Sequence, residues 1–254
     1  MELYNADCIK AMSVLDDNSI DMVFCDLPYG TTQNPWDSII PFEDLWAAYD
    51  RIVKQDGAIL LMAQPPFDKL LGASNLKDFR YEWNWEKNKA TGHLNAKKMP
   101  MKAHEMILVF YKKLPTYNPQ MTEGHKPMNA VLPRDNMPEP EVKRNYNHVE
   151  KRTGNPGGST TRYPRDVVRF PVINNDSPLK FHPTQKPVEL IEYFIKTYSN
   201  EGDVVLDNAM GSGSTGVAAQ NLNREFIGIE NNKEYFDQAV SWIKSENLLT
   251  ASTQ

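Results

Sequence analysis

The sequence predicts an α/β domain built on a parallel sheet. Two observations carry this prediction. Met22–Cys25 is an apolar run of strand length that stops at Asp26, and Asp203–Leu206 is a second such strand, which leads into a glycine-rich loop and a helix. In an open parallel sheet, ligands bind beyond the carboxyl ends of the strands. The turns that follow these two strands are therefore candidate binding sites.

Further elements follow in order along the chain. Glu2–Asn5 can form a short strand, and Asp7 can then cap a helix whose apolar side chains share one face. Apolar periodicity predicts later helices, and short apolar or alternating runs predict strands. The predicted helices cover Phe42–Val53, Phe67–Leu71, Pro187–Tyr198, Val217–Leu222 and Tyr235–Ile243; the predicted strands cover Ala58–Ala63, Tyr81–Trp85, Met106–Tyr111 and Phe226–Ile229.

The composition is that of a globular protein, with 254 residues, 40% hydrophobic and 24% charged. This size suits one large domain or a core with an insertion. No apolar run is long enough to span a bilayer, and the N-terminus lacks the basic start and apolar core of a signal peptide. Cys8 and Cys25 have neither metal-binding nor redox spacing. We therefore expect no metal and a cytoplasmic location.

The charge is unevenly distributed along the chain. The net charge is −5, yet residues 86–170 contain 16 basic and 8 acidic residues, a net of +8, which leaves −13 for the remainder. A basic segment on an acidic body is typical of a surface that faces nucleic acid. A solvated loop is the alternative explanation.

The turn Asp26–Tyr29, called the acidic turn below, reads Asp-Leu-Pro-Tyr. Pro28 and Gly30 stop both the strand and any helix. Asp26 can accept hydrogen bonds, Tyr29 offers a flat aromatic face, and Leu27 offers a backbone carbonyl. These groups suit a planar ring that carries an exocyclic amino group.

The middle of the chain has a different character. Twelve of the 18 prolines lie between Pro115 and Pro187, where neither helical nor strand periodicity is found. A stretch this long is an insertion of loops and short strands rather than a simple connection. Its basic side chains, and those of a stretch expected to be flexible after Trp85, suit phosphate contacts. They are Lys151, Arg152, Arg162 and Arg165, and Lys89, Lys97 and Lys98.

The C-terminal part contains the second candidate site. Thr184 and Lys186 stand at a helix start, where backbone amides and positive charge can hold a carboxylate. The run Asp207–Thr215, called the glycine loop below, lets a ligand approach the backbone, and Glu230 at the next strand end can bind ribose hydroxyls. With Gly216 the glycines spell GxGxxG, so NAD is one candidate ligand. Asp207 would repel a pyrophosphate, whereas it would tolerate an ammonium.

Four stretches resemble motifs of the DNA amino-methyltransferases, which methylate adenine N6 or cytosine N4. The acidic turn resembles Asp-Pro-Pro-Tyr, with Leu27 in place of the first proline. His182–Pro187 resembles His-Pro-x-x-Lys-Pro, which in that family lies against the methionine part of the cofactor S-adenosyl-L-methionine. The glycine loop resembles Asp-x-x-x-Gly-Ser-Gly. Glu230 is the fourth match. In addition to these four, Asp7-Cys8 resembles an acidic-Cys pair that lies near the adenosine part of the cofactor in that family. The catalytic motif precedes the cofactor motif, as in the permuted beta group.

The resemblance implies a Rossmann-like methyltransferase fold that depends on S-adenosyl-L-methionine. Its mostly parallel, seven-stranded sheet has helices on both faces, a circularly permuted motif order and one antiparallel strand near an edge. Residues 1–114 would form the catalytic half, 115–180 a loop-rich target-recognition insertion, and 181–254 the cofactor-binding half of the same domain.

The implied activity is transfer of a methyl group to adenine N6 in double-stranded DNA after base flipping. Adenine is preferred because the cytosine N4 enzymes more often carry Ser at the position of Asp26. A cytosine N4 methyltransferase, an NAD-dependent oxidoreductase and a DNA-binding module made inactive by Leu27 are the alternatives. A second copy of the chain and a cognate restriction endonuclease are candidate partners.

The predicted site has three groups of residues and no metal ligands. The catalytic residues are Asp26, Leu27, Pro28 and Tyr29. The cofactor-binding residues are Asp7, Cys8, Thr184, Lys186, Asp207, Ala209, Met210, Gly211, Ser212, Gly213, Ser214, Thr215, Glu230 and Asn231. The DNA-binding residues are Lys89, Lys97, Lys98, Lys151, Arg152, Arg162 and Arg165.

Overall fold

The computed structural model describes residues 1–31, 34, 37–130, 155–174, 180, 182 and 185–251. The chain forms two compact units, Met1–Asn118 with Arg165–Gln254, and Pro119–Pro164. In the described part of the smaller unit, a bridge between extended segments joins Thr122 and Arg162. This unit lies within the predicted insertion 115–180.

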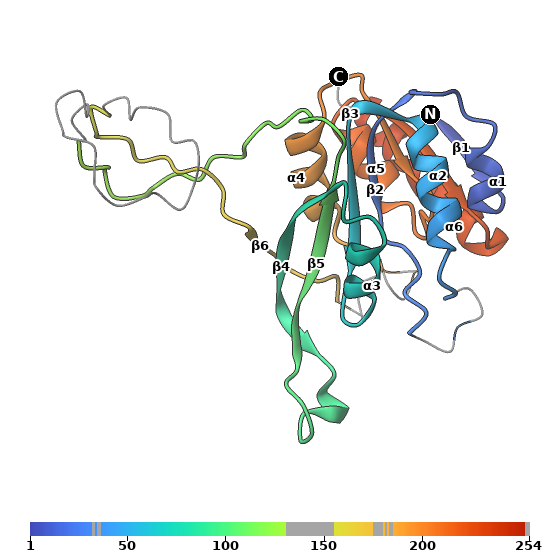
Figure 1. The fold of residues 1–254 in the computed structure, drawn as a ribbon, viewed down its shortest axis with the longest axis horizontal. Helices are drawn as coiled ribbons and strands as arrows, with labels where there is room; N and C mark the ends of the chain where they lie inside the picture. The colour runs from blue at the N-terminus through green and yellow to red at the C-terminus, as the bar shows by residue number, and fades with distance from the viewer. Residues whose placement is uncertain are drawn as a thin grey trace. The chain divides into compact units, whose positions relative to one another are not determined.

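The larger unit contains one sheet of eight strands (Figure 1). Neighbouring strands are parallel except at β5, which runs antiparallel to both β3 and β4. In sheet order the strands are β1 (Glu2–Asn5), β8 (Glu225–Glu230), β7 (Val204–Asp207), β2 (Ile20–Cys25), β3 (Val53–Ala63), β5 (Lys102–Phe110), β4 (Phe79–Thr91) and β6 (Val167–Phe170).

The fold class is confirmed, but the sheet has eight strands where seven were expected. The additional edge strand is β6, which lies inside the predicted insertion. It has four residues, of which Val168 alone is buried, so its side chains give almost no periodic signal. Backbone pairing with β4 makes it a strand.

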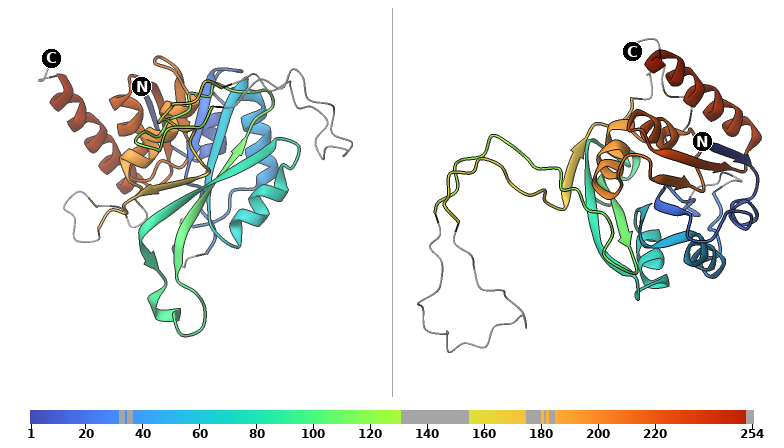
Figure 2. Two further views of the ribbon diagram at one scale, coloured as in Figure 1. Left: turned by 90° about the vertical axis from the view of Figure 1, so that its left-hand side faces the viewer. Right: turned by 90° about the horizontal axis from the view of Figure 1, so that it is seen from above.

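Helices cover both faces of the sheet (Figures 1 and 2). In β2, Val23 and Cys25 belong to one core and Met22 and Phe24 to the other. Burial on both faces explains why this strand reads as an unbroken apolar run. One face carries α1 (Cys8–Met12), α2 (Phe42–Ile52) and α3 (Phe67–Ser74); the other carries α4 (Val188–Tyr198), α5 (Ser214–Asn221) and α6 (Lys233–Ala251).

Strands β4 and β5 form a long hairpin that extends beyond the body of the sheet (Figure 1). The short helix η1 (His93–Asn95) lies between the two strands. The prediction of a flexible loop directly after Trp85 is therefore wrong, because β4 continues to Thr91. Ladder pairing with β5 and β6 extends the strand, and residue periodicity does not report such pairing. Within the part of the chain that is described, no helix is long and apolar enough to cross a membrane.

Candidate active site

The two candidate turns line one cavity of about 1330 Å³. Strands β2, β7 and β8 are parallel neighbours, so their carboxyl ends meet at one edge of the sheet. Asp26–Tyr29 follows β2, Asp207 ends β7, and Glu230 ends β8. Residues far apart in sequence thus meet through strand order alone.

The acidic turn is held by side chains, one of its own and two from elsewhere in the chain. The Tyr29 hydroxyl donates a hydrogen bond to Asp26 Oδ1 at 2.6 Å, and the Lys186 ammonium donates to Asp26 Oδ2. The Tyr29 ring stacks on Phe67 with centroids 5.0 Å apart. Burial, reinforced by the Asp26 carboxylate, raises the pKa of Tyr29 well above its usual value. The hydroxyl therefore remains a hydrogen-bond donor, and Leu27 is buried in the core beneath it.

The chain that leaves the acidic turn is fixed by Asp37. Its carboxylate accepts hydrogen bonds from the backbone amides of Gly30 at 2.9 Å and Thr31 at 3.0 Å. Asp37 is largely buried and lines the cavity. It is a second carboxylate in this loop that sequence reasoning did not single out.

Glu105 and Lys87 are functional candidates that the sequence analysis missed. Lys186 Nζ lies 3.6 Å from Glu105 Oε2, and the Lys87 ammonium donates to Glu105 Oε1. All three side chains line the cavity, as Asp26 does. The available sequence signal was an acidic residue immediately before the apolar run of β5.

The carboxylate of Asp207 is buried at the start of the glycine loop. It accepts hydrogen bonds from the Ala209 amide at 3.1 Å and from Thr215 Oγ1 at 2.6 Å. Burial raises its pKa to about 6, although both hydrogen bonds oppose this rise. A buried acid of this kind gains most from a cationic ligand.

Gly213 has a different role from the other glycine-loop residues. Its φ is +84°, and an added Cβ would lie 3.0 Å from side-chain atoms of Ala239 and Ile243 in α6. It does not line the cavity, so packing of α5 against α6 requires this glycine. The other predicted cofactor residues within the described ranges do line the cavity: Asp7, Cys8, Lys186, Asp207, Ala209, Met210, Gly211, Ser212, Ser214, Thr215, Glu230 and Asn231. Thr184 lies outside the described residues.

Glu230 is held by backbone amides. Its Oε2 accepts from the Gly211 amide at 3.0 Å, and its Oε1 accepts from the Asn232 amide at 2.7 Å. Each carboxylate oxygen has two lone pairs, so both oxygens can accept a further hydroxyl. Burial raises the pKa of Glu230, and the amides counteract this effect.

His182 is buried against Tyr235, with ring centroids 4.3 Å apart. Burial and the neighbouring ammonium groups of Lys186 and Lys180 lower the pKa of His182 to about 4. The ring is therefore neutral near pH 7. It closes the cavity beside Gly211, whose added Cβ would lie 3.4 Å from the His182 ring.

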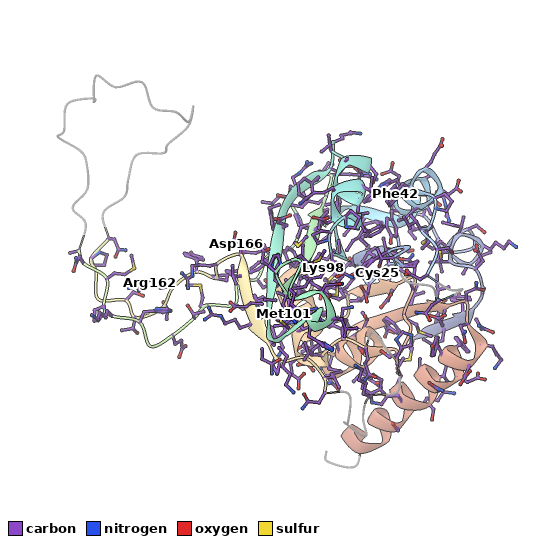
Figure 3. All side chains as sticks on the ribbon, turned by 90° about the horizontal axis from the view of Figure 1, so that it is seen from below. Cys25, Phe42, Lys98, Met101, Arg162 and Asp166 are labelled. Atoms are coloured by element: carbon purple, nitrogen blue, oxygen red, sulfur yellow. The ribbon has the colours of Figure 1, made fainter. Side chains whose placement is uncertain are left out.

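The predicted DNA-binding residues come from different parts of the chain. Lys89 lines the cavity and donates to Asn174 Oδ1 at 2.7 Å. Lys97 and Lys98 are exposed and are not among the residues that line the cavity; Lys98 is labelled in Figure 3. In the smaller unit, the Arg162 guanidinium donates to the carbonyls of Lys126, Ser159 and Thr161 at 2.6–2.9 Å (Figure 3). These bonds hold the loops of that unit together. Arg165 is exposed; Lys151 and Arg152 lie outside the described residues.

The cavity suits a cationic nucleoside better than a phosphate ligand. Asp207 would attract a cation, Glu230 can accept ribose hydroxyls, and the glycine loop brings its backbone to the cavity wall. Two carboxylates would instead repel a pyrophosphate. Among the described residues, no His, Cys, Asp and Glu side chains are grouped to hold a metal ion.

Comparison with known proteins supports this chemistry. The N6/N4 methyltransferase family, described as DNA methylase, matches residues 20–241. The type II methyltransferase M.HpaI of Haemophilus parainfluenzae is 30% identical over 95% of this chain and 73% of its own length. The DNA adenine methyltransferase YhdJ of Escherichia coli K12 is 30% identical over 92% of this chain and 79% of its own length.

Two solved structures are similar in fold. The M1.HpyAVI–SAM complex has a TM-score of 0.60 and 23% identity, with 95% of this chain and 98% of that chain covered. The cytosine-N4-specific PvuII DNA methyltransferase has a TM-score of 0.64 and 14% identity, with 96% of this chain and 90% of that chain covered.

Proposed function

This chain belongs to the DNA methylase family, in its beta group of amino-methyltransferases, and on that premise we propose that its target atom is N6 of adenine. Its activity is site-specific methylation of DNA with S-adenosyl-L-methionine as methyl donor. The NAD-dependent oxidoreductase considered from GxGxxG is thereby excluded. The observation that carries the choice of adenine is the carboxylate of Asp26 in the acidic turn.

Two further points support adenine over cytosine. The cytosine N4 enzymes of the resembled group more often carry Ser where this chain has Asp26. The relative named a DNA adenine methyltransferase is 30% identical over 92% of this chain. By contrast, the cytosine-N4-specific structure, at 14% identity, shows a likeness in fold alone.

The acidic turn would receive the flipped base. Extruding a base from the duplex costs a few kcal/mol, and stacking on Tyr29 would recover roughly 1–3 kcal/mol. The Asp26 carboxylate and the Leu27 carbonyl would accept the two amino hydrogens. This draws the nitrogen lone pair out of conjugation with the ring and directs it toward the methyl group. Catalysis is then mainly positioning and electrostatics.

The glycine loop and the end of β8 would hold the cofactor, which supplies a methyl group on a positively charged sulfur. Glu230 would accept the ribose hydroxyls through the lone pairs that its two amide donors leave unused. The backbone of Gly211–Thr215 would face the methionine part, and Asp207 would face its positive charge. Asp7 caps α1 through the Lys10 amide at 3.1 Å and would lie near the adenosine.

Lys186 has two candidate roles. Its position at a helix start predicts that it binds the carboxylate of the cofactor. Its ion pairs with Asp26 and Glu105 support a role at the acidic turn. Affinity for the cofactor and turnover of a Lys186 variant separate the two roles.

The proposed DNA contacts are the hairpin lysines and the insertion 115–180. Replacing Lys97 and Lys98 by Gln should lower DNA affinity and reduce its salt slope by about 2, because each phosphate contact contributes roughly one unit. Titration of DNA at several salt concentrations measures this slope. An unchanged slope would place the contacts elsewhere.

The remaining partner assignments are proposals as well. Relatives named type II methyltransferases support a cognate restriction endonuclease. A homodimer would be detected by sedimentation of the purified chain. A cytoplasmic location rests on the two unpaired cysteines and stays a prediction.

Nucleoside mass spectrometry tests the target base. Unmethylated DNA is incubated with the protein and S-adenosyl-L-methionine, digested to nucleosides and analysed. We expect N6-methyladenine. N4-methylcytosine would overturn the choice of base, and no modified base, with the cofactor shown to bind, would indicate an inactive DNA-binding protein.

A further inference from the structure

Four charged side chains of alternating sign form a chain of contacts on the wall of the active site. We call them the charged cluster: Asp26, Lys186, Glu105 and Lys87. Lys186 donates to Asp26 and lies 3.6 Å from Glu105, and Lys87 donates to Glu105. Two negative and two positive charges leave the cluster neutral.

Most of the cluster is shielded from water. The side chains of Lys87, Glu105 and Lys186 are 7%, 11% and 11% exposed, whereas that of Asp26 is 23% exposed. Burial alone would lower the pKa of Lys186 and raise that of Glu105, but their opposite charges dominate, so the pKa of Lys186 is raised and that of Glu105 is lowered. Lys186 and Glu105 are therefore both charged near pH 7, and each depends on its neighbours for compensation.

One end of the charged cluster lies on regular strands, and the other end lies on irregular backbone. Glu105 pairs with Trp85 in the β4–β5 ladder, and Lys87 lies two residues further along β4, on the same face of the sheet. The Lys87 ammonium also lies 5.3 Å from the centre of the Trp85 ring. Asp26 and Lys186, in contrast, lie on irregular backbone after β2 and before α4. The strand pair can therefore hold the turn side chains in place.

Glu105 competes with Asp26 for the same ammonium. Its Oε2 is buried, and among the described residues it makes no hydrogen bond and has the ion pair with Lys186. Asp26 must accept an amino hydrogen while it already accepts from Tyr29 and Lys186. An ammonium that belonged to Asp26 alone would compete more strongly with the substrate for that carboxylate.

We propose that Glu105, supported by Lys87, is a positioning residue for methyl transfer, which shares the Lys186 ammonium with Asp26 and keeps the Asp26 carboxylate oriented and available to the target amino group. This inference deepens the proposed function and rests on methyl transfer to DNA. It does not depend on which base is methylated.

The variants test charge and geometry separately. Glu105→Gln removes the charge in a side chain of the same size and leaves two ammonium groups facing one carboxylate. We expect kcat to fall by about 10- to 100-fold, as for misplacement by a fraction of an ångström, with KM for DNA and for the cofactor changed by less than about threefold. Glu105→Asp keeps the charge and should retain more activity. The double variant Glu105→Gln with Lys87→Met restores the neutrality of the cluster. Its kcat should lie between that of Glu105→Gln and that of wild type.

A matched control lies next to the cluster on β4. Glu86 pairs with Arg169 at 2.7 Å, and its side chain is 45% exposed. Glu86→Gln removes a carboxylate from the same strand without touching the charged cluster. Its kcat should equal that of wild type.

The experiment is steady-state transfer of labelled methyl groups from S-adenosyl-L-methionine to unmethylated DNA, with thermal unfolding of every variant. The proposal is supported by the order wild type, Glu105→Asp, double variant, Glu105→Gln in kcat, at nearly constant KM. A folded Glu105→Gln variant with wild-type kcat would overturn the proposal. So would a loss of kcat that only matches the loss of folded protein in each variant, or a double variant with the kcat of wild type. If Glu105→Gln does not fold, the kcat of the double variant tests the proposal, because the double variant leaves no uncompensated charge. The label counts either base, so N4-methylcytosine would overturn the adenine proposal without deciding this one.

Discussion

The acidic turn and the glycine loop hold their carboxylates by different means. Asp26 is held by side chains, the Tyr29 hydroxyl and the Lys186 ammonium. Glu230 is held by the backbone amides of Gly211 and Asn232, and Asp207 in part by the Ala209 amide. A carboxylate held by side chains depends on particular residues elsewhere in the chain, whereas one held by amides depends on the course of its own loop.

This difference predicts that catalysis and cofactor binding can be separated by mutation. Substitutions around the acidic turn should alter turnover. Substitutions at the glycine loop and the end of β8 should alter affinity for the cofactor.

The largest expected effect is at Asp26. Asp26→Ala should lower kcat by about 10³-fold or more, because it removes the carboxylate that we propose as the acceptor for the amino hydrogen. Affinity for S-adenosyl-L-methionine, measured by calorimetry, should stay within about twofold. Equal losses of turnover and affinity would contradict the separation of the two turns. Asp26→Asn, which keeps one acceptor oxygen, is the matched control.

Glu230→Ala tests the other side of the comparison. Hydrogen bonds to a charged group contribute roughly 1.5–3 kcal/mol, so we expect affinity for the cofactor to fall by about 10- to 100-fold. Turnover at saturating cofactor should change little. A calorimetric titration and saturation kinetics on the same preparation measure both quantities; unchanged affinity would remove Glu230 from the ribose site.

Lys186→Met decides between the two roles of that lysine. If the ammonium serves Asp26, kcat should fall by about 10-fold or more while affinity for the cofactor changes by less than about threefold. A large loss of affinity with normal turnover at saturation would instead support binding of the cofactor carboxylate. Lys180→Met, at a neighbouring lysine that also lines the cavity, is the control for loss of positive charge.

The smallest expected effect is a pH dependence of cofactor binding. The pKa of Asp207 is raised to about 6, and a cation binds best to its ionised form. Affinity for the cofactor should therefore be nearly maximal from about pH 7 upward and should fall as the pH decreases through 6, by about tenfold between pH 7 and pH 5. Calorimetry across this range measures the effect. Asp207→Asn should bind weakly and without this dependence; an equal slope in that variant would assign the titration to another group.

Much of this site could be predicted from the sequence because its signals are local. The acidic turn can be recognised because an apolar run of strand length stops at Asp26, and Pro28 prevents the strand from continuing. The glycine loop and Glu230 likewise follow strands of their own. Parallel strand order then brings these turns to one edge, so the cavity that they share follows from the predicted fold class.

Other features depend on pairing between segments far apart in the sequence. The eighth strand, β6, and the extension of β4 to Thr91 rest on backbone ladders rather than on periodic side chains. Gly213 reads as a ligand-binding glycine, but the approach of α6 gives it a packing role.

The sequence by itself determined the α/β class, the order of the motifs, and the acids at the ends of β2, β7 and β8. Local turn chemistry and strand-length apolar runs suffice for these. The tertiary structure alone decided that Lys186 contacts Asp26, that Glu105 contacts Lys186, and that Lys87 contacts Glu105. The reason is that a buried charge is stable only beside its counter-charges, and the register of β4 on β5, together with the position of the segment before α4, determines which charges meet.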